Sequence, residues 1–334
     1  MLSRLADALF WFGRYLERAE HTARLLDVNY HAIVEAPLAS AGRGIVAEQW
    51  APLLRVTDSE PAFRQRFDRA DAASVVAWLT THPDNPASIR ACLTFARENA
   101  RALRDRISTE TWEAVNRAYH ALAATVDAAP EEDALHEYCV SVREASHLVT
   151  GIIDATLPRD LGWYVLAAGR SLERADNVVR TLMVRHRRAE DGPVAAGLEA
   201  HRAMALLKSM SAYEAYRKRH RTPPDPERIA AYLLLDPAFP RSLRASLEAL
   251  HADVRRIVAL NPAAPREVER QVGWLTARVA YCPHVGRIVE DGDPSLDELL
   301  DALSEISDTM ARTYFGVANG GGVDDDASEP AGVD

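Results

Sequence analysis

A single charged phrase occurs twice in this chain, and the repetition constrains the fold more than any other feature of the sequence. Gly-Arg-x-Leu-Glu-Arg-Ala followed by Glu or Asp occupies residues 13–20 and, 156 residues later, residues 169–176. Each copy has an arginine four residues after its last acid, at Arg24 and Arg180. The charged and apolar side chains are spaced as on two faces of a helix. One helix kept in both halves indicates an internal duplication.

A second pair of segments extends this duplication. Residues 78–93 resemble residues 232–247, and a Pro-x-Ser sequence stands at the same place in both. Their offset of 154 residues is close to that of the first pair. We therefore predict two helical repeats, at 1–156 and 157–316, each of about six helices. We expect the repeats to be related by a pseudo-twofold axis, as the two copies of an isologous dimer are.

The fold class predicted for the whole chain is all-α. Apolar residues recur at helical spacing along nearly its full length, and no segment alternates convincingly as a half-buried strand does. Several of the 18 prolines and 16 glycines fall between the helical segments or in the last residues. The predicted helices are 2–35, 46–57, 72–81, 87–107, 109–128, 132–156, 160–190, 195–219, 226–235, 240–259, 264–281 and 295–315.

The end of the chain and its charge exclude one class of function. Residues 317–334 are rich in Gly and Asp and have almost nothing to bury, so we expect a disordered acidic tail there. The formal net charge is −10, and the acids of this tail account for about half of it. Because a general nucleic-acid-binding protein would normally present a basic field, we expect no nucleic-acid partner.

The cysteines and the hydropathy pattern predict a cellular compartment. Cys92, Cys139 and Cys282 lie far apart without a CxxC spacing, which predicts neither a disulfide framework nor a zinc site. No uncharged run approaches the roughly 20 residues that span a bilayer. Charged residues from Arg14 onward interrupt any signal-peptide core. We therefore expect a cytoplasmic protein with no membrane partner.

On a helical wheel, each copy of the phrase forms a charged stripe opposite an apolar face. The first stripe and its flank contain Gly13, Glu17, Arg18, Glu20 and Arg24. The second contains Gly169, Glu173, Arg174, Asp176 and Arg180.

We expect the two phrase helices to face each other, with the glycines allowing a close approach. An unpaired buried charge costs several kcal/mol or more, so each acid should meet an arginine, whose planar fork fits a carboxylate. The predicted pairs are Glu17 with Arg180 and Glu173 with Arg24.

Two other interpretations of the stripes stay open. Acids and bases three or four residues apart are most often a solvated helix face, worth about 0.2–0.5 kcal/mol per pair. The stripes could also form a ligand or catalytic site, and four carboxylates could bind a divalent cation. A di-iron bundle, however, requires a Glu-x-x-His pair, whereas His21 directly follows Glu20. We expect no metal and no cofactor.

A second cluster of cations forms one face of the helix that follows Pro86: Arg90, Arg97, Arg101 and Arg104. Guanidinium groups in such a row could dock a carboxylate or phosphate group of a substrate or partner. The alternative is a surface helix whose Glu98 and Asp105 neutralise part of the charge.

Several phrases together make the chain resemble the bacterial alpha-E family, an all-helical domain with a Glu-Arg motif. They lie at residues 1–4, 11–20, 85–88, 96–101, 104–108 and 234–242, within a resemblance that covers about 1–315. The motif corresponds to Glu17-Arg18 and Glu173-Arg174. Members tend to be encoded beside, or fused to, a circularly permuted ATP-grasp protein, often with a transglutaminase-like protease. The resemblance therefore implies these partners and a part in making or modifying a peptide.

The expected function combines this resemblance with the absence of familiar catalytic motifs. The sequence contains no phosphate-binding loop, dinucleotide fingerprint, Gly-x-Ser-x-Gly elbow or His-Glu-x-x-His helix. We expect a non-catalytic accessory or substrate-holding module for an ATP-grasp-type amide ligase. The alternative is an enzyme that acts on peptide amide bonds with Glu17 or Glu173 as general base, which would require a carboxylate with a raised pKa in a cleft.

Overall fold

The computed structural model describes residues 3–34, 50–123, 129–189, 196–220, 222, 224–289 and 294–316. These residues form helices and include no strand, which confirms the predicted all-α class. The predicted acidic tail lies outside the described residues. Within the described ranges, no helix combines the length and the apolar character needed to cross a bilayer.

The helices follow one another in two groups. The first group is α1 (Ser3–Val34), α3 (Ala51–Val56), α4 (Glu60–Arg64), α5 (Ala72–Thr80), α6 (Ile89–Ala102), α7 (Thr109–Ala123) and α8 (Glu132–Thr156). The second is α9 (Leu161–Ala189), α10 (Ala196–Ser209), α11 (Tyr213–Arg219), α12 (Pro226–Leu235), α13 (Leu243–Leu260), α14 (Glu267–Ala280), α15 (Gly286–Val289), α16 (Leu296–Met310) and the π-helical turn η2 (Ala311–Phe315).

Most helices begin and end close to the predicted residues, because capping side chains mark their starts. Asp71 and Ser295 each form a capping box, and Asp225 accepts a hydrogen bond from the backbone of its helix. The prediction of one helix over 195–219 was wrong. Ser211 has a φ of 56°, which ends α10 before α11 begins.

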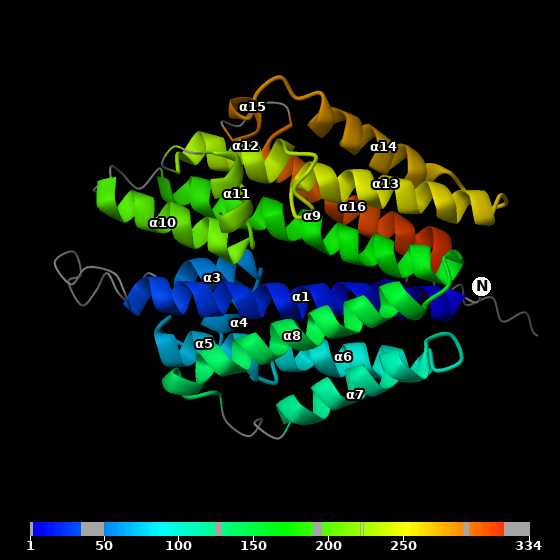
Figure 1. Cartoon of the computed structure of the whole chain (residues 1–334), viewed down its shortest axis with the longest axis horizontal. Coiled ribbons are helices and arrows are strands. Elements are labelled where there is room, and N and C mark those ends of the chain that lie inside the picture. The colour runs from blue at the N-terminus through cyan, green and yellow to red at the C-terminus, as the bar shows by residue number, and fades with distance from the viewer. Residues whose placement is uncertain are drawn as a thin grey trace, which may run out of the picture.

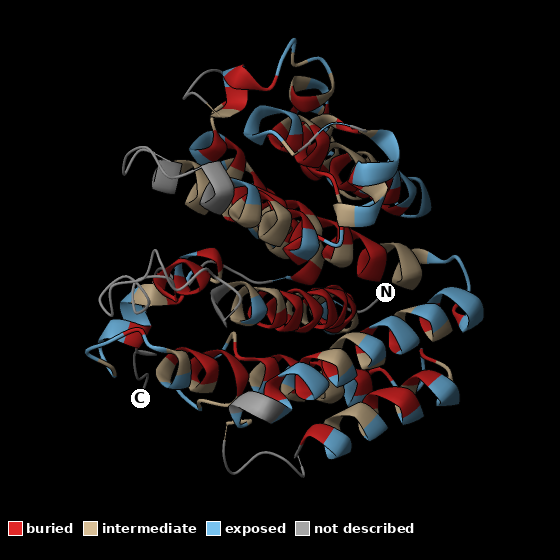
Figure 2. Ribbon diagram, turned by 60° about the vertical axis from the view of Figure 1, so that its left-hand side comes forward, coloured by how far each residue is buried: buried red, intermediate tan, exposed pale blue. Residues whose placement is uncertain are grey.

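The two long helices α1 and α9 lie side by side at the centre and run in the same direction (Figure 1). Helices α6 and α8 pack on α1, with α7 outside them, whereas α13 and α16 pack on α9, with α14 outside them. Buried residues concentrate on the inner helices, and the outer helices present the exposed ones (Figure 2). The predicted boundary after residue 156 coincides with the end of α8, but a large apolar core that includes Phe12 and Leu172 spans both sides of it.

Two glycines allow the backbones of α1 and α9 to touch. A Cβ atom on Gly13 would lie 2.4 Å from the backbone oxygen of Leu166, and one on Gly169 would lie 2.2 Å from that of Phe10. No real Cβ contact is so short. The predicted close approach is therefore present at both glycines. We call this contact between residues 10–18 and 166–174 the seam.

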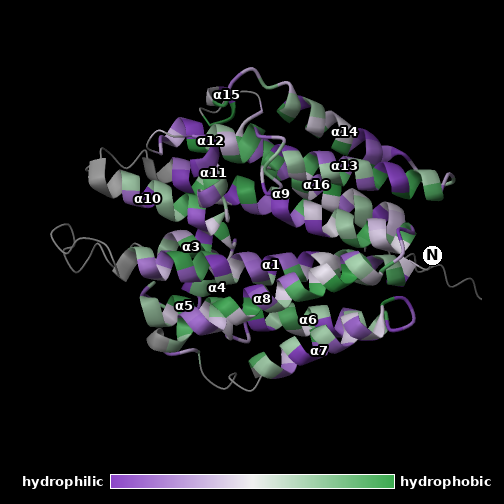
Figure 3. Ribbon diagram, in the orientation of Figure 1, coloured by the Kyte–Doolittle hydropathy of each residue, from purple (hydrophilic) through white to green (hydrophobic). Residues whose placement is uncertain are grey.

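The seam is unusual because the helices that form it carry hydrophilic residues at the centre of the molecule. Figure 3 shows hydrophilic segments alternating with apolar ones along both α1 and α9. On α1 the charged side chains Glu17 and Glu20 are only 5% and 2% exposed. Buried charges require partners, and the seam is therefore the first candidate for a functional site.

Candidate functional site

The Glu-Arg motifs of the two halves cross the seam and bind each other. Arg18 donates from Nε to Glu173 Oε1 at 2.6 Å and from a terminal nitrogen to Oε2 at 3.0 Å, a bidentate pair. In the other direction, Arg174 Nε lies 2.9 Å from Glu17 Oε2. Each glutamate therefore meets the arginine of the other motif.

Each glutamate also has a second arginine. Arg14 donates to Glu173 Oε2 at 2.7 Å, and Arg241, in the connection before α13, lies 3.0 Å from Glu17 Oε1. Sequence analysis missed both Arg14 and Arg241 as partners. Arg241 could have been noticed, because Ala87 stands at its place in the matched segment of the first half.

The predicted partners Arg24 and Arg180 were wrong. Arg24 donates to Glu20 on its own helix, and Arg180 donates to Asp176 at 2.7 Å. Both pairs join residues four apart. Since α1 and α9 are parallel and in register, Arg180 lies six residues beyond Arg174, or about 9 Å further along the axis.

The arginines hold the buried carboxylates in the charged form. Burial alone would raise the pKa of Glu173, but Arg18 and Arg14 outweigh it and lower the pKa to about 2. Burial opposes ionisation of Glu20 as well, yet Arg241, His147 and Arg24 keep its pKa well below the usual value. Asp176 differs.

Burial, followed by the charge of Glu173, raises the pKa of Asp176 despite the ion pair with Arg180. Arg180 also reaches Asp58, at 3.2 Å. The four acids of the stripes are therefore all paired, and the arginines lower the pKa of Glu20 and Glu173.

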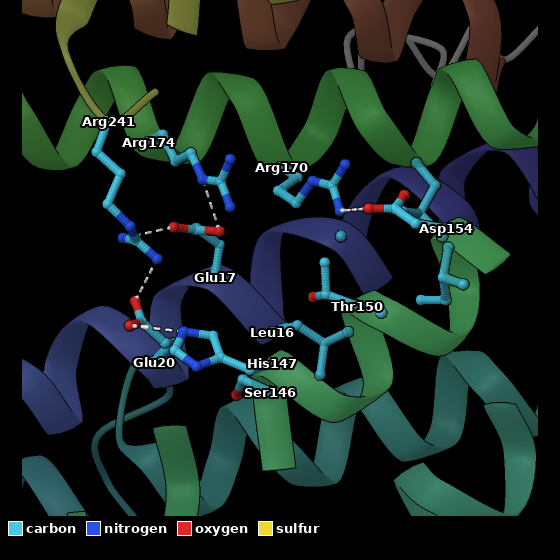
Figure 4. A pocket seen from close by; sticks show the side chains of 14 residues that line it. Leu16, Glu17, Glu20, Ser146, His147, Thr150, Asp154, Arg170, Arg174 and Arg241 are labelled. Carbon is cyan, nitrogen blue, oxygen red and sulfur yellow. Dashed lines mark hydrogen bonds and ion pairs between the residues drawn. The ribbon is translucent and has the colours of Figure 1, made fainter. Parts of the chain in front are cut away.

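A cavity of about 220 Å³ opens on one side of the seam, between α1, α8 and α9. Figure 4 shows Arg241 and Arg174 reaching Glu17, Arg241 continuing to Glu20, and His147 approaching Glu20 from α8. The cavity is lined by Gly13, Leu16, Glu17, Glu20, Ser146, His147, Thr150, Gly151, Ile153, Asp154, Leu166, Arg170, Arg174 and Arg241.

Three arginines and three carboxylates line this cavity: Arg170, Arg174 and Arg241, and Glu17, Glu20 and Asp154. Arg24 and Arg241 serve Glu20, Arg174 and Arg241 serve Glu17, and Arg159 and Arg170 stand 3.7 and 3.6 Å from Asp154. Arg24 and Arg159 contact these acids from outside the cavity lining.

A hydroxyl group in the wall of the cavity completes its polar lining. Ser146 is 3% exposed, and its Oγ has no hydrogen-bond partner among the described residues. Ser307 of α16, by contrast, accepts a hydrogen bond from Arg14 at 2.8 Å. Among the described residues, the Ser146 hydroxyl is therefore available to a ligand in this cavity, whereas the Ser307 hydroxyl is already bonded.

The four arginines predicted as one helix face do not form one free row, and Arg104 lies beyond the end of α6. Arg97 donates to Asn116 Oδ1 at 2.8 Å and lies over the ring of Tyr119, and it shares Glu98 with Arg101. Arg104 lies over the ring of Trp112. Arg90, Arg101 and Arg104 are exposed and Arg97 is half-buried. None of the four lines the cavity of the seam.

His21, next to Glu20, makes stability depend on pH. It is 3% exposed, and its burial, with Arg241 adding to the effect, lowers its pKa to about 4. The unfolded chain, with an ordinary histidine pKa near 6.5, therefore binds a proton that the folded chain excludes. The contribution of His21 to stability is complete above about pH 6.5 and is lost as pH drops towards 4, by up to about 1.4 kcal/mol per pH unit.

We expect His21→Leu to remove this dependence, because Nε2 has no hydrogen-bond partner among the described residues and leucine carries no proton. The measurement is denaturant unfolding between pH 7 and pH 4. The exposed His120 is the control, since His120→Leu should keep the wild-type slope. An unchanged slope in His21→Leu would contradict the assignment.

Comparison with known proteins gives a family and distant relatives. A family model described as a predicted alpha-helical domain with a conserved ER motif matches residues 1–315. The uncharacterized protein Mb2597 of Mycobacterium bovis and the uncharacterized proteins MT2643 and Rv2567 of Mycobacterium tuberculosis are each 28% identical over 342 residues. The match covers 95% of this chain but 37% of each relative. No solved structure matches the chain.

Proposed function

This chain belongs to the Alpha-E family, and on that premise we propose that it is a non-catalytic module that holds a substrate for an ATP-grasp-type amide ligase. The substrate would belong to a peptide synthesis or modification system. The module would bind a carboxylate group of that substrate in the cavity beside the seam. An amide ligase joins a carboxylate to an amine, so holding such a group is a useful task for a partner domain.

One observation carries this proposal: the glutamates at the cavity are already engaged by arginines that reach them from other elements. Glu17 and Glu20 are each within 3.0 Å of Arg241. Carboxylates that arginines hold in this way can help to bind and orient a ligand. The guanidinium groups of Arg170, Arg174 and Arg241 line the cavity, and the hydroxyl of Ser146 has no partner among the described residues, so both can donate hydrogen bonds to an anionic ligand.

The enzyme alternative has less support. A general base works best with a pKa near the operating pH, whereas arginines lower the pKa of Glu173 to about 2 and that of Glu20 well below its usual value. Asp253 of α13, whose pKa burial raises to about 7, is not among the residues that line the cavity.

We also propose that the fold arose by duplication, with a pseudo-twofold axis along the seam. The packing supports this, since α6 lies on α1 as α13 lies on α9, and α3 contacts α9 as α10 contacts α1. Ser88 and Ser242 cap α6 and α13 in the same way. The Arg18–Glu173 pair and the Arg174–Glu17 pair would then be the same contact, repeated by the pseudo-twofold axis.

The partners stay proposals: a circularly permuted ATP-grasp protein and, in some systems, a transglutaminase-like protease. The relatives extend well beyond the matched part, which agrees with a module that works beside further domains. The exposed Arg90, Arg101 and Arg104 are the proposed contact surface. A cytoplasmic location is supported by the free thiols of Cys92 and Cys139.

The test is co-purification with the neighbouring ATP-grasp protein, followed by ATP turnover with peptide substrate, with and without this chain. We expect a complex and a faster turnover. Arg241→Ala should keep the complex but lose most of the stimulation, because Glu17 and Glu20 retain Arg174 and Arg24 while the cavity loses its central cation.

The control is Arg256→Ala, which removes an exposed arginine near the end of α13, whereas Arg241 lies just before the start of that helix. It should behave as the wild type. If no complex forms and turnover does not change, the accessory function is wrong. If the isolated chain itself hydrolyses or forms peptide amides, the enzyme alternative is correct.

A further inference from the structure

A group of metal-ligating side chains lies outside the seam, where α1 faces α8. Asp27 and His31 stand one helical turn apart on α1, and His136 comes from α8. His136 Nδ1 lies 2.7 Å from Asp27 Oδ1, His31 Nε2 lies 3.5 Å from the same oxygen, and the two ring nitrogens are 3.4 Å apart. Three atoms that can each bind a metal therefore point at one spot.

We propose that Asp27, His31 and His136 bind one zinc ion. Zinc binds histidine nitrogen and carboxylate oxygen at about 2.0–2.1 Å, so the ligand atoms of a tetrahedral site lie about 3.3 Å apart. Two of the three separations already have this value to within 0.2 Å. The third is a hydrogen bond between His136 Nδ1 and Asp27 Oδ1; zinc would take the place of the proton on Nδ1, and the neutral imidazole would carry its proton on Nε2.

Arg143 of α8 orients the carboxylate in the way that metal sites commonly use. It lies 3.2 Å from Asp27 Oδ2, the oxygen that does not face the histidines. Asp27 is 5% exposed, so its side chain is fixed, whereas both histidine rings are about half exposed and can adjust. A supporting hydrogen bond to the second carboxylate oxygen aims the first one at the metal.

The donor set selects the metal class. Two imidazole nitrogens and one carboxylate oxygen suit zinc and similar transition metals, whereas magnesium and calcium prefer oxygen ligands alone. Because the chain supplies three ligands, a fourth position is open, as in zinc sites that bind water or substrate.

That fourth position has space beside it. Asp27 and His31 also line a cavity of about 380 Å³, whose wall includes His201 and Lys208 of α10. A zinc ion held by α1 and α8 would thus face a chamber large enough for a small ligand, with Lys208 available to an anionic one.

The sequence alone does not reveal this group, because its three ligands share no compact motif. Asp27 and His31 have the four-residue spacing of ligands on one helix, but the third ligand comes 105 residues later. Only the packing of α8 against α1 brings it near.

The experiment titrates the chelator-treated full chain with Zn²⁺ alone by calorimetry, and with Co²⁺ to follow the coordination geometry by its visible absorption. We expect one equivalent to bind with a Kd of about 1 µM or tighter. Cobalt should give the intense bands of a four- or five-coordinate site. His31→Asn and His136→Asn should each weaken binding more than about tenfold.

His201→Asn is the matched control, since His201 lines the same cavity but is not one of the three proposed ligands, and its Nε2 lies 2.9 Å from the backbone oxygen of Ala32. It should bind zinc as the wild type does. Because both ligand histidines are about half exposed, the variants should keep the wild-type circular dichroism. Binding only at millimolar zinc, or an equal loss in His201→Asn, would overturn the proposal. The test needs no ligase, so its result is independent of the proposed function.

Discussion

Replacing Gly169 by alanine is expected to destabilise the chain by about 3 kcal/mol or more, at the upper end of what overpacking usually costs. The added Cβ would lie 2.2 Å from the backbone oxygen of Phe10. A side chain could rotate away, but a backbone oxygen can retreat only if α1 and α9 separate. Separation would also stretch the ion pairs of the seam. Chemical denaturation of the two proteins measures the difference.

Gly151 is the matched control, because the same substitution in α8 adds a Cβ that meets nothing within 4 Å. Alanine has the better helix propensity, so Gly151→Ala should raise stability by about 0.5–1 kcal/mol. Opposite signs for the two substitutions are the expected result. If Gly169→Ala were as stable as the wild type, the backbones would not touch at this glycine.

Removing the charge of Glu173 is the second large effect. Glu173→Gln should lower the free energy of unfolding by about 3 kcal/mol, since it leaves Arg14 and Arg18 without their carboxylate. We take the lower end of the usual range because the Arg18 side chain is 26% exposed. Glu248→Gln in the surface pair with Arg244 is the control, and it should cost less than about 0.5 kcal/mol.

The same residue predicts a pH dependence. The folded pKa of about 2 lies below the ordinary glutamate value of 4.5, so the unfolded chain takes up the proton first. The stabilisation is complete above about pH 4.5 and is lost as pH falls towards 2. Glu173→Gln should therefore show a shallower loss of stability in this window. A slope equal to that of the wild type would contradict the lowered pKa.

Much of the fold was predictable from the sequence, because helical period and capping residues act locally. Asp71, Asp225 and Ser295 mark helix starts by their own hydrogen bonds. The failure at 195–219 is also local in cause, since nothing about Ser211 as a residue type shows that it adopts a positive φ.

The site was predictable only in part. Two copies of one charged phrase indicated that acids and arginines would meet across the seam, and the glycines indicated how closely. The partner of each acid depends on the direction and register of α1 and α9, which the helical wheel of one helix does not contain. Glu17 therefore meets Arg174 rather than Arg180. Arg241 and His147 join the site from other elements, so only the tertiary fold reveals them.

The central claim is that the Glu-Arg motif of each half binds that of the other. A double-mutant cycle between Arg18 and Glu173 tests it most directly, with unfolding free energies for Arg18→Ala, Glu173→Ala and the double variant. We predict a coupling energy of at least about 1.5 kcal/mol for this pair, and none beyond about 0.5 kcal/mol between Glu173 and Arg24. Additive effects at Arg18 and Glu173, or a larger coupling of Glu173 to Arg24, would contradict the account.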